Sequence, residues 1–158
     1  MNKQRFYFDL PTENDDDAFD EAAEWACELS SKDSAINRIV FLAPHKSATS
    51  WLKRVYSEKY GASVVSKLFD GFELKPGFPI FKILLGGDYN DIFAKSDVVI
   101  VMSTASNFLP QIEEVSSVRA IIAIPAVMNS KIVVDWIEEY NPERIRGQFD
   151  LWSVPPRK

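Results

Sequence analysis

The chain has 158 residues, of which 46% are hydrophobic and 26% are charged, and its net charge is −5. These values are typical of one folded domain, 1–158, with a core of ordinary size, and they do not predict disorder outside the ends. A single Cys and a single His exclude an internal disulfide and a finger-type zinc site, so we expect no metal site.

The charges are distributed unevenly along the chain. Residues 1–35 carry 3 basic and 10 acidic side chains, a net charge of −7, whereas residues 36–158 carry 15 basic and 13 acidic ones, +2. Nucleic-acid-binding domains need a basic face, so we expect no nucleic-acid partner. The N-terminus lacks the apolar region of a signal peptide, and no apolar run reaches the roughly 20 residues that cross a bilayer. We therefore expect a cytoplasmic protein that does not bind membranes.

The first predicted elements are a strand, an acidic helix and a second strand. The alternating aromatic run 5–10 predicts the first strand. Three aspartates at 15–17 suit the start of a helix, because carboxylates complement the partial positive charge there. Apolar residues then recur at helical spacing as far as Leu29. The nearly continuous apolar run 38–44 predicts a strand that is buried on both faces.

The middle of the chain is less regular. A second helix is predicted to end at Gly61, and residues 62–68 are interpreted as the third strand. Residues 69–87 form an irregular insertion, in which the Asp-Gly pair 70–71 indicates a hairpin turn. The run 79–85 is ambiguous between a strand and a short helix, and we favour the helix.

The second half of the chain returns to a regular alternation. The apolar runs 97–103 and 118–126 predict two further strands, with a helix at 107–117 between them. A last helix at 129–141 is predicted to be capped by Asn129 or Ser130 and to stop before a proline.

This order of elements predicts an α/β fold with three layers. We expect a Rossmann-like, mostly parallel sheet of five strands with helices on both faces. The runs 38–43, 97–102 and 119–124 lack polar alternation and should be adjacent central parallel strands. The tail 143–158 is expected to be a loop, with room for an edge strand at 149–154.

The predicted strands specify where a ligand would bind. In an open parallel sheet, ligands bind outside the carboxyl ends of the strands, and the loops that follow these strands are rich in hydroxyl and amide side chains. The same loops also offer Thr12, Asn129 and Ser130. The candidate ligand-binding residues are Asp9, His45, Lys46, Ser47, Thr49, Ser50, Ser103, Thr104, Ser106 and Asn107.

The loop 44–50 is the strongest candidate among them. Free N–H groups at a helix start attract anions, Lys46 adds a positive charge, and His45 can donate or accept a proton near neutral pH. The loop contains no glycine, and the glycine-rich phosphate and dinucleotide motifs are absent. We expect a phosphate or carboxylate group here, with the hydroxyls of 103–106 on the opposite wall.

A purely structural interpretation competes with this one. Ser, Thr, Asn and Asp are also the preferred helix caps, so Ser47, Thr49, Asn107 and Ser130 can be explained by capping alone. His45 can likewise be an ordinary loop side chain.

Two functions of different classes follow. The first is a small domain that binds an anionic small molecule, such as a nucleotide or a phosphorylated metabolite, at the carboxyl edge of the sheet. The alternative is a non-catalytic regulatory or protein-interaction module that uses the acidic first helix or the aromatic tail around Trp152. The sequence assigns no catalytic residue and no cofactor, and it leaves open a protein partner or a homo-oligomer.

Overall fold

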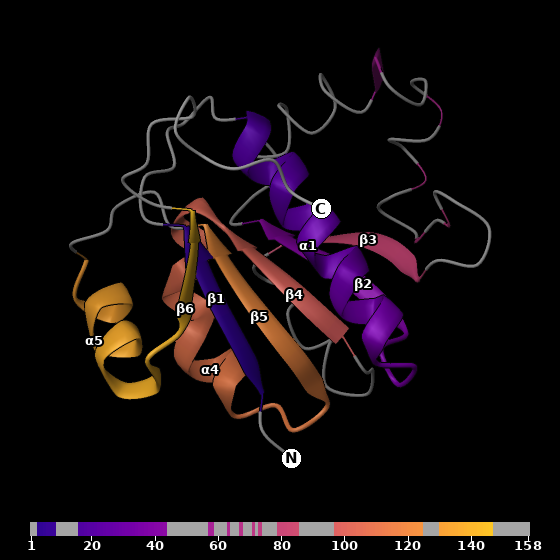
Figure 1. Ribbon diagram of the computed structural model, residues 1–158. Helices are drawn as coiled ribbons and strands as arrows, with labels where there is room; N and C mark the ends of the chain where they lie inside the picture. The colour runs from indigo at the N-terminus through magenta and orange to yellow at the C-terminus, as the bar shows by residue number, and fades with distance from the viewer. Residues whose placement is uncertain are drawn as a thin grey trace.

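A parallel β-sheet forms the centre of the computed structural model (Figure 1). The structure describes residues 3–8, 16–43, 57–58, 63, 67, 71, 73, 79–85, 97–124 and 130–146. Within these residues the sheet has six strands in the order β3-β2-β4-β5-β1-β6, and every adjacent pair is parallel. The strands are β1 Gln4–Phe8, β2 Arg38–Ala43, β3 Ile80–Leu85, β4 Asp97–Met102, β5 Val118–Ile124 and β6 Glu143–Arg146.

The three apolar runs form the centre of the sheet, as predicted. β4 pairs with β2 on one side and with β5 on the other. Every residue of β2 and β4 is buried. Successive side chains of a strand point to opposite faces, so a strand covered on both faces has no position for a polar alternation. In β2, Phe41 accordingly packs in the core on one face and Leu42 in the core on the other.

Helices cover both faces of the sheet, which confirms the predicted α/β class (Figure 1). Helix α1 (Asp16–Lys32) packs against one face through small and apolar residues such as Ala22, Ala26 and Leu29. The opposite face is covered by the 3-10 helix η3 (Ser103–Phe108), by α4 (Leu109–Glu113) and by α5 (Lys131–Tyr140). None of the helices in the described ranges combines the length and the apolar character needed to cross a membrane.

Helix α5 shows the predicted terminal signals. The Ser130 hydroxyl accepts a hydrogen bond from the Val133 N–H at 3.3 Å and so caps the first turn. At the other end, Asn141 adopts the left-handed conformation, with φ of 48°, and its N–H donates to the Ile137 carbonyl. The chain cannot continue as a helix because Pro142 follows.

The helix predicted at 107–117 is shorter than expected. The chain first forms η3, and the α-helical part begins only at Leu109, with Pro110 in its first turn. Proline has no N–H to donate to the carbonyl four residues earlier, that of Ser106. That carbonyl instead accepts from the Leu109 N–H, three residues on, in the tighter 3-10 pattern. The missing N–H of Pro110 therefore explains why the Ser106 carbonyl is bonded in the 3-10 pattern where η3 joins α4.

Two predictions in the middle of the chain are wrong. Of residues 62–68 the structure describes Ser63 and Lys67, and both are helical, so the third strand predicted there is wrong. Apolar residues at 64, 65 and 68 also match helical spacing, and a short apolar run does not separate the two structures by pattern alone. Gly71 has a positive φ of 96°, as a turn residue would, and the flanking residues 68–70 and 72 lie outside the described residues, so the hairpin stays a prediction. The helix at Ser57 and Glu58 agrees with the one predicted to end at Gly61.

The favoured helix at 79–85 is also wrong, because β3 occupies Ile80–Leu85. β3 pairs with the side of β2 that β4 leaves open, from Arg38 opposite Ile80 to Ala43 opposite Leu85. The expected irregular insertion thus contains an edge strand. Pro79 directly precedes it, a position where the missing N–H of proline costs no ladder bond.

The tail begins with a strand rather than a loop. β6, at the opposite edge from β3, pairs in parallel with β1, with a register shift between Tyr7 and Phe8. Its four residues include three charged side chains, so the segment lacks the apolar pattern of a strand. The edge strand expected at 149–154 lies outside the described residues. Within the described residues the sheet has six strands, one more than predicted.

Candidate functional site

The connections of the sheet diverge between β2 and β4. These strands are neighbours in register, with Leu42 opposite Val101. From β2 the chain continues to β3 on one side, and from β4 it continues to β5 on the other side. Such a topological switch point is where open parallel sheets bind their ligands, outside the carboxyl ends of the strands. The loop 44–50 and the segment that begins at Ser103 start from this place.

The candidate residues fall into two groups. Ser103 and Thr104 directly follow β4 as the first residues of η3, at the carboxyl edge of the sheet. In the same helix Ser106 is buried and Asn107 is exposed. The other candidates lie outside the described residues: Asp9, His45, Lys46, Ser47, Thr49 and Ser50.

Among the described residues that were predicted as helix caps, Ser130 is a cap and Asn107 is not. Ser130 caps α5, as the structural interpretation holds. Asn107 does not cap a helix, because it lies inside η3, and α4 has Phe108 at its N-cap position without a side-chain bond. Met102 precedes η3 in extended conformation, also without a side-chain cap.

Helix η3 is held against the sheet at the switch point. It contacts β2, β4, β5 and α5. Ala105 and Leu109 are fully buried in the core on this face. A run of six residues is long for a 3-10 helix, whose hydrogen bonds have poorer geometry than those of an α-helix. Its position therefore depends on tertiary contacts more than on its own backbone bonds.

The opposite, amino edge of the sheet carries ion pairs that join distant elements. Arg38 and Asp97, the first residues of β2 and β4, form a bidentate pair with distances of 3.0 and 2.8 Å. The Asp97 residue is fully buried and Arg38 is 7% exposed. Near the start of β5, Arg119 pairs with Asp33 in the turn after α1 at 2.8 Å. The buried pair of Arg38 and Asp97 requires both partners, because either charge alone would be desolvated without compensation.

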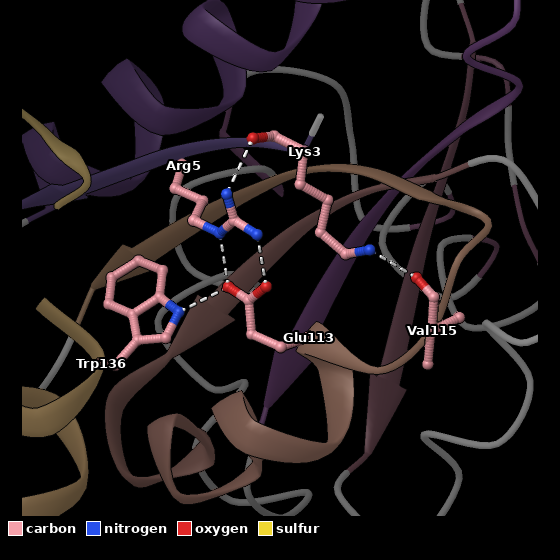
Figure 2. A network of polar contacts seen from close by, with 5 residues as sticks. All are labelled: Lys3, Arg5, Glu113, Val115 and Trp136. Atoms are coloured by element: carbon pink, nitrogen blue, oxygen red, sulfur yellow. Dashed lines mark hydrogen bonds and ion pairs between the residues drawn. The ribbon is translucent and has the colours of Figure 1, made fainter. Parts of the chain in front are cut away.

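A third pair belongs to the polar network in Figure 2. Two nitrogens of Arg5, in β1, donate to the two carboxylate oxygens of Glu113, in α4, at 2.7 and 2.8 Å. The indole N–H of Trp136, in α5, donates to the same carboxylate at 2.7 Å. The Glu113 side chain is 3% exposed. This carboxylate therefore connects three elements through three charge-assisted hydrogen bonds.

Two further contacts complete the network. The Lys3 ammonium donates to the Val115 carbonyl at 2.7 Å (Figure 2). The Arg5 guanidinium lies 4.4 Å from the ring centroid of Tyr140, in cation–π geometry. Arg5 thus has its charge satisfied by the carboxylate and its face covered by an aromatic ring.

The surroundings change the pKa values in this network. The hydrogen bond to Glu113 raises the pKa of Arg5, so its charge is maintained. Burial lowers the pKa of Lys3, and the Glu113 carboxylate opposes part of that effect. Burial also raises the pKa of Tyr140, and the charge of Glu113 adds to it. Outside the network, the hydrogen bond from Arg119 lowers the pKa of Asp33.

These ion pairs were not predicted from the sequence, although one signal for them was present. Arg38 and Asp97 stand at the first positions of two apolar runs that were predicted to be adjacent and parallel. Opposite charges at equivalent positions of neighbouring strands would have predicted their pairing. Glu113 gave no such signal, because its partners lie 108 and 23 residues away.

Comparison with family models, with curated proteins and with solved structures finds no match. The geometry of the chain itself is therefore the basis for any functional proposal. Among the described residues, no three His, Cys, Asp or Glu side chains gather as metal ligands would.

Proposed function

We propose that the protein binds an anionic small molecule, such as a nucleotide or a phosphorylated metabolite, at the carboxyl edge between β2 and β4. The observation that carries this proposal is the topological switch point, where the connections from β2 and β4 lead to opposite sides of the sheet. The chain places His45, Lys46 and several hydroxyl residues in the loop that follows β2.

The expected ligand chemistry follows from these residue types. A lysine and a histidine favour an anion, and hydroxyl groups can donate to its oxygens. No glycine occurs at 44–50 or at 103–107. Dinucleotide-binding loops need glycine for close backbone approach to a pyrophosphate. A single phosphate or carboxylate group is therefore favoured over a pyrophosphate.

The likeness to Rossmann-like folds is confined to the switch point. The strand order here is β3-β2-β4-β5-β1-β6, whereas the dinucleotide-binding fold has the order 3-2-1-4-5-6. Binding at the carboxyl edge depends on diverging connections and not on one strand order. The proposal thus uses the general rule for open parallel sheets.

A thermal-shift screen of nucleotides, phosphorylated sugars and dicarboxylates tests the proposal. A ligand present at 100 times its Kd should add roughly 2.7 kcal/mol to the free energy of unfolding. We expect stabilisation by compounds that carry one phosphate monoester and none by their uncharged parent compounds.

Variants locate the binding. Lys46→Ala combined with His45→Ala should abolish the stabilisation and leave the melting temperature without ligand unchanged. Lys32→Ala is the matched control, because this exposed lysine ends α1 at the amino edge and should leave binding intact. No stabilisation by any anion, or equal loss in the control, would reject the proposal. The regulatory-module alternative would then be the better account.

A further inference from the structure

The segment from Ser103 to Glu113 connects the two edges of the sheet. It begins directly after β4, at the carboxyl edge, as η3 and continues without interruption as α4. It ends at Glu113, whose partner Arg5 is the second residue of β1. The proposed binding site and the network of Figure 2 therefore lie at the two ends of one helical segment.

Glu113 holds this segment through contacts to two other elements. One Glu113 oxygen accepts from Arg5 and the second accepts from both Arg5 and Trp136. Leu109 and Ile112 are fully buried and orient α4 against the sheet. The six-residue 3-10 helix η3 has weak internal hydrogen bonds. The contacts of Glu113, at the end of the following helix α4, therefore contribute to the position of η3.

From this arrangement we propose that Glu113 is a positioning residue for the carboxyl-edge site. Its carboxylate ties α4 to β1 and α5, and this tie keeps η3 in place beside the end of β2. The predicted effect of Glu113 on ligand binding rests on the proposed function. Its effect on η3 itself is independent of any ligand.

The test uses Glu113→Gln, which keeps the side-chain shape. The amide replaces one oxygen acceptor with an N–H donor, and that donor must face a nitrogen of Arg5 or Trp136. Two measurements are made: backbone amide exchange at 104–108, and the Kd of inorganic phosphate by titration calorimetry. We expect exchange in η3 to accelerate, and the Kd to rise, by roughly two- to thirtyfold. Amides of β4 should exchange at their wild-type rates.

Asp33→Asn is the matched control. It breaks the pair with Arg119, which also lies at the amino edge but joins the turn after α1 to β5. It should change neither η3 exchange nor phosphate binding. If Asp33→Asn and Glu113→Gln accelerate η3 exchange equally, the effect is general destabilisation and the inference is overturned.

The outcomes separate the inference from the proposed function. If the wild-type protein binds no phosphate but Glu113→Gln accelerates η3 exchange, the proposed function fails and the positioning role stands. If wild-type binding occurs and Glu113→Gln changes neither readout, the positioning role fails and the function stands. Should Glu113→Gln not fold, Trp136→Phe removes one donor and keeps the ion pair, and it decides the inference on the same readouts.

Discussion

The buried pair between Arg38 and Asp97 allows a sharp test of how this sheet is held together. The perturbation is a double-mutant cycle with Asp97→Asn, Arg38→Met and the two combined. Asparagine keeps the shape of the aspartate, and methionine keeps most of the apolar stem of the arginine. Each single change removes one charge of this pair and leaves the opposite charge buried between the two central strands β2 and β4.

The expected magnitude follows from the geometry. The pair makes two hydrogen bonds between charged groups, at 3.0 and 2.8 Å, and each such bond contributes about 1.5–3 kcal/mol. The side chain of Asp97 has no exposed surface and that of Arg38 is 9% exposed, so water cannot replace the lost partner. Each single variant should therefore lose about 3–5 kcal/mol of the free energy of unfolding. That is a large part of the roughly 5–15 kcal/mol typical of a domain.

The double variant should cost much less than the sum of the two single variants. Removing both partners removes the penalty of a lone buried charge, and a coupling of about 2–3 kcal/mol is expected. Urea denaturation followed by circular dichroism measures all four proteins. Single variants that lose less than about 1 kcal/mol, or a double variant with purely additive losses, would refute the reasoning.

Three smaller predictions concern the helix ends and pH. Ser130→Ala should lower the free energy of unfolding by about 1 kcal/mol, because the Val133 N–H loses its cap; an unchanged denaturation midpoint would contradict this. Asn141→Gly should preserve or slightly raise stability, whereas Asn141→Val should lower it by about 1–2 kcal/mol, since φ is 48°; equal midpoints would contradict the assignment. The pair with Arg119 lowers the pKa of Asp33 in the folded state, so its stabilisation is present above the ordinary Asp pKa of about 3.9 and is lost as pH falls through the lower folded value. Wild type should thus exceed Asp33→Asn by about 0.2–1 kcal/mol at pH 7, and the difference should shrink as the pH is lowered below the ordinary Asp pKa; a pH-independent difference would contradict it.

Much of the fold could be predicted from the sequence because its signals are local. Apolar runs long enough for a strand predicted β2, β4 and β5, and burial on both faces placed them at the centre of the sheet. Helical spacing predicted α1, and the Ser130 cap with the proline after Asn141 predicted both ends of α5. Each of these signals lies within the segment that it specifies, so no knowledge of the partner elements was needed.

The candidate site was only partly accessible in this way. The sequence identified the loops after the predicted strands, but which of them are neighbours follows from the strand order. The pairing of β2 with β4 brings the carboxyl end of β2, which residue 44 follows in the chain, beside the end of β4, which Ser103 follows. That adjacency arises because the chain moves to β3 and then returns past β2. The residue types at 44–50 and in η3 do not specify this order of strands.

Tertiary structure alone decided the edges of the sheet and its polar anchors. β3 and β6 lack distinctive patterns and become strands because β2 and β1 offer them unpaired backbone groups. The partners of Glu113 come from β1 and α5, and they meet only when α4 and α5 pack on the same face. Such contacts depend on the positions of whole elements, which the packing of the core determines, so they are not encoded in any short stretch of the chain.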